Sequence, residues 1–275
     1  MIDLHLHTTA SDGRLTPTEL VAHAAAAGVR ILAVTDHDTT DGFDEAAAEA
    51  ARQAVLLVPG IEITAVDRGR DVHMLGYFFD RSDAGFAQFL IAQRATRVTR
   101  IVEMAKRLGT LGMPVDVQPL VDEARRHNSK SIGRPRLARA MIDAGYVATT
   151  REAFDKWLGR GCPAFVERPG ASPEEVIAIV HRAGGLVSLA HPGRTGIDDR
   201  IAALRHAGLD AIEVFHSDHD AAMVTAYLAM ARELDFMITG GSDFHGDPAH
   251  GIAPGTSVLP ETEWTRLVGT RRTDG

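Results

Sequence analysis

The sequence predicts an α/β fold, a closed barrel of about seven strand-helix units with a mostly helical cap inserted in its second half. Short apolar runs alternate with amphipathic stretches along most of the 275 residues, which predicts parallel strands joined by helices. This alternation stops over residues 96–168, where only short helical segments are expected. We therefore divide the chain into a first barrel segment (1–95), the cap (96–168) and a second barrel segment (169–275).

The first strand and the first helix illustrate the two sequence signals, apolar periodicity and helix capping, from which the other elements are also predicted. Apolar and polar residues alternate over residues 2–6, which predicts a strand with two different faces. Thr16, Pro17 and Glu19 form a capping box with proline at the first helical position, so a helix is expected from there to Gly28. Further strands are expected at 31–34, 55–66 with a break at Pro59-Gly60, 72–79, 186–190, 211–215 and 236–239. Further helices are expected at 43–53, 82–109, 118–126, 135–144, 151–158, 173–184, 198–206 and 221–234.

Composition excludes several classes of protein. The single cysteine, Cys162, rules out an intrachain disulfide and a cysteine-based metal cluster. No stretch predicts a signal peptide or a membrane span, so we expect a cytoplasmic protein that does not bind membranes. The net charge of −8 argues against a general nucleic-acid coat, although residues 94–139 carry eleven Lys or Arg against four acidic residues.

Histidines and carboxylates follow the predicted strands with unusual regularity. Because the carboxyl ends of parallel barrel strands converge on one face, these side chains are expected to meet there. Burying so many of them together would be costly without cations, so the pattern predicts a metal centre held by His and carboxylate. The strand-end residues are His5, His7, His37, Glu62, His73, His191, His216, Asp243 and His245, and Asp12 follows the first of these strands closely. Asp3, Asp36 and Asp38 flank these residues, and we expect them to orient the imidazoles.

Five short motifs carry the strand-end residues: Asp3-Leu4-His5-Leu6-His7, Thr35-Asp36-His37-Asp38, Gly60-Ile61-Glu62-Ile63, Ala190-His191-Pro192-Gly193-Arg194 and Gly241-Ser242-Asp243-Phe244-His245. Together they resemble the PHP (polymerase and histidinol phosphatase) superfamily of metal-dependent phosphoesterases. The cap motif Ile132-Gly133-Arg134-Pro135 is similar to the branch of stand-alone bacterial nucleoside 3′,5′-bisphosphate phosphatases, some of which trim RNA from its 5′ end.

The resemblance implies a distorted (β/α)7 barrel that holds three divalent metals, with Mn²⁺ first and Fe, Zn or Mg²⁺ as alternatives. Such metals would lower the pKa of a shared water and supply hydroxide for attack on phosphorus. The implied ligand sets are His5, His7, Glu62 and Asp243 for one metal, Glu62, His73 and His191 for a second, and Asp12, His37 and His245 for a third.

The resemblance also implies hydrolysis of the 3′-phosphate of nucleoside 3′,5′-bisphosphates, with the 5′ end of short RNA as a further substrate. Arg134 and Arg194 are expected to bind phosphate and assist catalysis. Arg136 is a third candidate for substrate binding, at a position where this branch usually has His. His216 is expected either to protonate the leaving oxygen or to support the metal ligands.

Three other interpretations remain open from the sequence. One is a PHP phosphatase similar to histidinol phosphatase, whose cationic substrate would require acidic residues in the cap. Another is an amidohydrolase-type metal hydrolase, because a His-x-His pair on the first strand fits that class too. The third is a metal-stabilised module without catalytic activity. The expected partner is a phosphorylated nucleotide or a short RNA end, with no stable protein partner.

Overall fold

The strands form one seven-stranded sheet in sequential order, in a computed structural model that describes residues 1–126, 131–248 and 251–270. The first strand meets the chain just after the last one: Asp243 N donates to His5 O (2.9 Å) and His7 N donates to Phe244 O (3.0 Å). These bonds bring the two sheet edges together into a distorted barrel. The strands are β1 (Ile2–Leu6), β2 (Ile31–Val34), β3 (Leu56–Asp67), β4 (Arg70–Tyr77), β5 (Leu186–Leu189), β6 (Ala211–His216) and β7 (Met237–Gly241).

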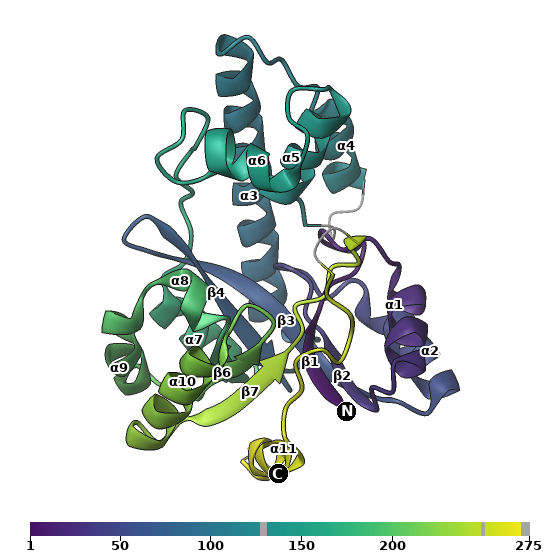
Figure 1. Cartoon of the computed structure of the whole chain (residues 1–275), viewed down its shortest axis with the longest axis vertical. Helices are drawn as coiled ribbons and strands as arrows, with labels where there is room; N and C mark the ends of the chain where they lie inside the picture. The colour runs from purple at the N-terminus through teal and green to yellow at the C-terminus, as the bar shows by residue number, and fades with distance from the viewer. Residues whose placement is uncertain (127–130, 249–250, 271–275) are drawn as a thin grey trace.

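Helices surround the barrel and also build the cap above it (Figure 1). The capping boxes predicted at Thr16 and Ser172 are both formed. The barrel helices are α1 (Pro17–Ala26), α2 (Phe43–Gln53), α7 (Pro173–Arg182), α8 (Pro192–Thr195), α9 (Asp198–His206), α10 (Ala221–Glu233) and α11 (Glu261–Gly269). The cap contains the upper portion of α3 (Ala84–Thr110), then α4 (Gln118–Arg126), α5 (Arg134–Asp143), α6 (Thr150–Ala153) and a π-helix, η1 (Phe154–Leu158). None of the helices described is long and apolar enough to cross a membrane.

The expectation of an all-parallel sheet is wrong at β4, which is antiparallel to both of its neighbours. Arg68 and Gly69 connect β3 to β4, and both have positive φ (48° and 73°). Such a two-residue turn closes a tight hairpin, so no crossover helix intervenes. The expected break at Pro59-Gly60 is also wrong, because β3 pairs with β2 up to Pro59 and with β4 from Gly60 onward.

One long helix connects two separate hydrophobic clusters. Phe86 and Leu90, near the beginning of α3, pack in the barrel cluster, while Ile101, Met104 and Leu108, further along, pack in the cap cluster. A single helix therefore fixes the cap above the end of the barrel where β1 to β3 lead into their loops (Figure 1).

A buried ion-pair network joins the barrel to the cap. The Asp38 carboxylate accepts hydrogen bonds from Arg97 Nε on α3, from Arg168 Nη1 (3.4 Å) and from Thr64 N (2.9 Å). Burial would raise the pKa of Asp38, but the two guanidinium groups outweigh it and hold that pKa below its ordinary value. Asp38 therefore remains ionised and neutralises charge that is buried with it.

We predict that Asp38→Asn lowers the free energy of unfolding by about 3–5 kcal/mol, because it leaves buried arginines without their counter-charge. Asn keeps the size of the side chain and tolerates the positive φ of this position. Urea unfolding monitored by circular dichroism measures the change. The control is Glu103→Gln, which removes an exposed pair with Lys106 on α3 and should cost less than about 1 kcal/mol. Equal losses in the two variants would contradict the role given to Asp38.

Candidate metal centre

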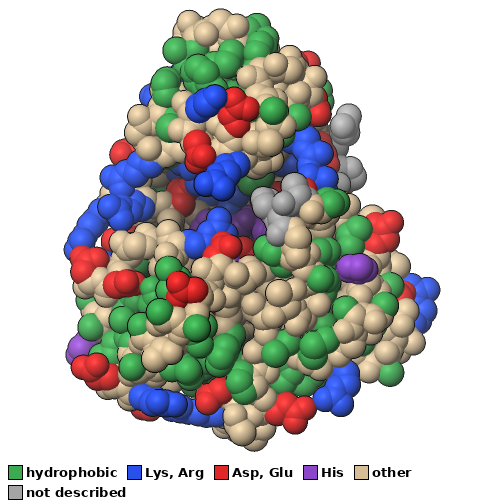
Figure 2. All heavy atoms as spheres, in the orientation of Figure 1, with side chains coloured by type: hydrophobic (Ala, Val, Ile, Leu, Met, Phe, Trp, Pro, Cys, Tyr) green, Lys and Arg blue, Asp and Glu red, His purple; other side chains and the backbone are tan. Residues whose placement is uncertain are grey.

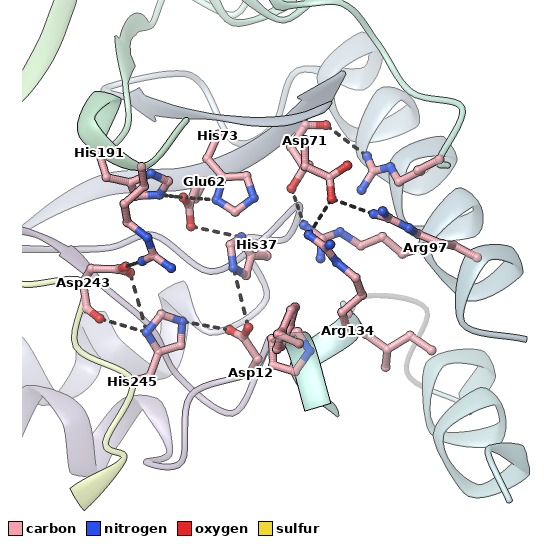
Figure 3. Close-up of a pocket in the computed structure, with 18 of the residues that line it drawn as sticks. Asp12, His37, Glu62, Asp71, His73, Arg97, Arg134, His191, Asp243 and His245 are labelled. Atoms are coloured by element: carbon pink, nitrogen blue, oxygen red, sulfur yellow. Dashed lines mark hydrogen bonds and ion pairs between the residues drawn. The ribbon is translucent and has the colours of Figure 1, made fainter. Parts of the chain in front are cut away.

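All nine side chains predicted as metal ligands lie together at one end of the barrel. Seven of them line a cavity of about 320 Å³ (Figure 3). His5 and His7 are buried beside Glu62 and Asp243. His73 stands near the beginning of β4 rather than at its end. Because β4 is antiparallel to its neighbours, this beginning lies beside the carboxyl end of β5, and His73 reaches the same site.

Glu62 on β3 is the centre of the cluster. Its carboxylate oxygens lie within 3.4 Å of ring nitrogens of five histidines. The distances are 2.7 Å to His73 Nδ1, 3.0 Å to His37 Nδ1, 3.1 Å to His191 Nε2, 3.2 Å to His7 Nε2 and 3.4 Å to His5 Nε2. One carboxylate is thus shared by imidazoles from five different positions in the fold.

Two carboxylates complete the cluster on either side of Glu62. Asp243 Oδ1 lies 3.3 Å from His5 Nε2 and 3.2 Å from His7 Nε2. Asp12 lies 3.3 Å from His245 Nε2 and 3.6 Å from His37 Nε2. Two sets of four residues therefore have ligand atoms within 4.8 Å of one another. They are His5, His7, Glu62 and Asp243, and His7, Asp12, His37 and His245.

Buried polar atoms without a hydrogen-bond partner converge on this cluster. A buried unsatisfied donor or acceptor costs about 1–3 kcal/mol, so a concentration of them points to a ligand. Coordination of cations would satisfy these lone pairs, and the donor set of imidazole and carboxylate suits divalent metals. The atoms are Glu62 Oε2, His5 Nε2, His7 Nδ1 and Nε2, His37 Nδ1, His73 Nδ1, His191 Nδ1 and His216 Nε2.

The charges of the cluster are suitable for metal binding. Burial would raise the pKa of Glu62, but the surrounding imidazoles outweigh it and hold that pKa well below its ordinary value. The pKa values of Asp12 and Asp243 are lowered by neighbouring histidines in the same way. Burial lowers the pKa of His191 to about 4, which keeps this imidazole neutral. Ionised carboxylates and neutral imidazoles are the forms that bind metals, so His5 and His7, whose pKa values are raised by the neighbouring carboxylates despite burial, would release protons when a metal binds.

Glu213 on β6 contacts two of the predicted ligands, and the sequence analysis missed it. Its carboxylate is fully buried, with Oε1 2.9 Å from His5 Nδ1 and Oε2 accepting from His191 N at 2.8 Å. This carboxylate therefore orients one predicted ligand and fixes the backbone of another. The signal was present, since an acidic residue inside a buried apolar strand requires a partner.

The expectation that Asp3, Asp36 and Asp38 orient imidazoles is wrong. Among the described residues, their hydrogen bonds go to other groups. Asp36 accepts from Thr8 N (2.8 Å) and Asp3 accepts from Ser242 N (2.9 Å), while Asp38 holds the arginines of the cap interface. These carboxylates satisfy backbone amides and guanidinium groups around the ligands. They therefore hold the backbone of the segments that carry the imidazoles and do not orient the imidazole rings directly.

Besides Arg194, four arginines line the wall of the cavity: Arg97, Arg100, Arg134 and Arg168. Figure 3 shows Arg97 and Arg134 on the side away from His191 and Asp243. Asp71 Oδ2 accepts from Arg100 Nη1 (2.6 Å) and Arg134 Nη2 (2.8 Å), and Asp38 balances Arg97 and Arg168. Burial, with the neighbouring guanidinium groups, lowers the pKa of Arg134 to about 10. The wall carries more positive than negative charge, and Figure 2 shows Lys and Arg side chains around the hollow where histidines are visible.

The remaining candidates occupy three different places. Arg194 is half exposed, and its Nη1 lies 3.4 Å from Asp243 Oδ2, at the junction with a second cavity of about 980 Å³. Arg136 lines only this second cavity and donates to Glu123 Oε2 at 2.7 Å. His216 is buried and lines neither cavity; its Nδ1 accepts from Asp218 N (3.0 Å), and its Nε2 lies 3.4 Å from Asp243 Oδ2.

Comparison with known proteins places this geometry in a family. The PHP domain model matches residues 3–142, which include His5, His7, Asp12, His37, Glu62 and His73. A 3′,5′-nucleoside bisphosphate phosphatase of Chromobacterium violaceum is 35% identical over 267 residues, covering 94% of this chain and 92% of the relative. A 5′-3′ exoribonuclease of Haemophilus influenzae is 35% identical over 248 residues, covering 88% of this chain and 89% of the relative.

A solved structure supports the same relationship through the fold. A protein of Bifidobacterium adolescentis, assigned as a metal-dependent phosphoesterase, superposes with a TM-score of 0.87 at 33% identity, over 97% of this chain and 95% of its own. The family-model match contains β1 from Asp3 onward and β2 to β4, and the matches to the relative from C. violaceum and to the solved structure extend over 94% and 97% of the chain. The chain belongs to the PHP family.

Proposed function

We propose that this protein is a metal-dependent phosphoesterase that removes the 3′-phosphate from nucleoside 3′,5′-bisphosphates. The observation that carries the proposal is the pairing of two features in one cavity, a cluster of metal-type ligands and a wall of four arginines. A substrate with two phosphates matches this arrangement, because one phosphate can lie at each side. The relative from C. violaceum, named for this activity, supports the choice.

The proposed metal ligands are His5, His7, Asp12, His37, Glu62, His73, His191, Asp243 and His245. Divalent ions held there would supply Lewis acidity for the attack of water on phosphorus. Mn²⁺ is our first choice, because it accepts both imidazole and carboxylate ligands, with Fe, Zn and Mg²⁺ as alternatives. We place the enzyme in the cytoplasm, where nucleotides are available.

The arginines of the chain hold the substrate in this proposal. Arg134 is the first residue of α5, so its guanidinium and the helix N-terminus together favour the 5′-phosphate. Arg194, beside Asp243, neutralises charge on the 3′-phosphate at the metal end. His216 lines neither cavity, so we assign it to the support of Asp243 rather than to proton donation.

Trimming of short RNA from its 5′ end is the second candidate. The larger cavity adjoins the first through shared residues and provides room for further nucleotides. Arg136 lies in this outer cavity and would contact RNA rather than a mononucleotide. Histidinol phosphate is disfavoured, because the arginine wall would repel its cationic amine.

We predict that Glu62→Gln loses bound divalent metal, because the carboxylate shared by five imidazoles disappears. The protein is loaded with Mn²⁺ and desalted, and inductively coupled plasma mass spectrometry then measures the number of metal ions bound per chain. The matched control is Glu49→Gln on α2, a buried carboxylate away from the site, which should retain the metal content of the wild type. Unchanged metal content in Glu62→Gln would refute the assignment of Glu62.

We predict that the wild type with Mn²⁺ releases phosphate from adenosine 3′,5′-bisphosphate and much less from 5′-AMP. Arg134→Ala should raise the KM for the bisphosphate by about 10- to 150-fold, the value of a charge-assisted hydrogen bond. Arg136→Ala should leave this KM unchanged and weaken only the cleavage of short 5′-phosphorylated RNA. Equal turnover of the bisphosphate and 5′-AMP would rule out the bisphosphate assignment.

A further inference from the structure

Phe154 lies where the two cavities meet. It lines both the inner cavity of about 320 Å³ and the outer cavity of about 980 Å³. Among the described residues that line either cavity, it is the single Phe, Tyr or Trp. The other aromatic rings that line these cavities are the imidazoles of His37, His73, His191 and His245, which we propose as metal ligands, so the Phe154 ring is the aromatic surface left to a ligand among the described lining residues.

The position of the ring is fixed by the cap. Phe154 is the first residue of the π-helix η1 and packs, partly buried, against the hydrophobic cluster of the cap. Its carbonyl accepts a hydrogen bond from Gly159 N at 2.9 Å. A Cβ at Gly159 would lie 2.5 Å from this oxygen, so glycine is required for the close approach. The ring therefore does not depend on a ligand for its placement.

Arg134 connects this ring to the proposed phosphate site. Its Cζ lies over one face of the Phe154 ring, 5.4 Å from the ring centre, and its Nη2 donates to Asp71 at the cavity wall. The guanidinium proposed to bind the 5′-phosphate is thus a direct neighbour of the aromatic surface. In a nucleotide, the phosphates and the base are attached to the same ribose. A residue that binds the base must therefore lie close to the residues that bind the phosphates.

We propose that Phe154 forms the nucleobase subsite, with the base of the substrate stacked at the mouth of the outer cavity on the part of the ring that Arg134 leaves open, and the phosphates directed into the inner cavity. Stacking on an aromatic ring accepts every base, because each base presents a π-face. The subsite therefore selects nucleotides over other phosphate esters without selecting a particular base. This inference rests on the proposed function.

Two substrates test the proposal, adenosine 3′,5′-bisphosphate and a ribose 3,5-bisphosphate analogue without a base. Phe154→Leu keeps an apolar side chain in the cap and removes the ring. It should raise the KM for the nucleotide by about 5- to 150-fold, the value of one base-aromatic stack, with little change in kcat. The KM for the base-free analogue should stay within about twofold of the wild type, and Phe154→Trp should restore nucleotide binding.

Phe165→Leu is the matched control. Phe165 is another half-buried aromatic residue of the cap, with Arg100 Cζ 5.3 Å from its ring centre, but it lines neither cavity. This variant should leave both KM values unchanged.

Three results would overturn the inference in distinguishable ways. An equal rise in both KM values for Phe154→Leu would show that the ring only supports the cap. An equal kcat/KM of the wild type for both substrates would refute the base subsite, but it would leave the proposed bisphosphatase activity standing. A wild type that hydrolyses neither substrate would refute the proposed function and this inference with it.

Discussion

The Glu62 carboxylate is the constraint on which the rest of the site depends. Five imidazoles lie within 3.4 Å of its oxygens, and a group of this kind is stable in a buried place only when its charges are balanced. The fold brings one of these imidazoles to Glu62 by reversing the direction of a single strand, β4. The hairpin at Arg68-Gly69 returns the chain immediately, so that His73 on β4 faces the same cluster as Glu62 on β3.

A second charged layer lies between the barrel and the cap. Asp38 and Asp71 each hold two arginines, and these pairs join α3, α5 and the segment near Arg168 to the barrel. The same guanidinium groups line the cavity. The structural ion pairs and the anion recognition that we propose therefore use the same residues. One network positions the cap and gives the pocket its positive charge.

The sequence was sufficient for features that depend on local periodicity or on strand ends. The capping boxes at Thr16 and Ser172 are local, and the convergence of the predicted ligands other than His73 follows from the rule that parallel barrel strands end on one face. Features that depend on partners distant in the chain were not predictable in this way. The direction of β4 required recognition of a two-residue turn, and the roles of Glu213 and Asp71 appear only when His5, His191 and Arg134 are brought beside them.

The two separate hydrophobic clusters bridged by α3 have an evolutionary consequence. The cap keeps its own packed interior, so mutations there can alter the substrate contacts that we propose while the strands that carry the histidines keep their packing. Selection for a new ligand can therefore act on the cap and the barrel separately. A lineage that preserves the barrel and diversifies the cap gains new specificities without rebuilding its chemistry.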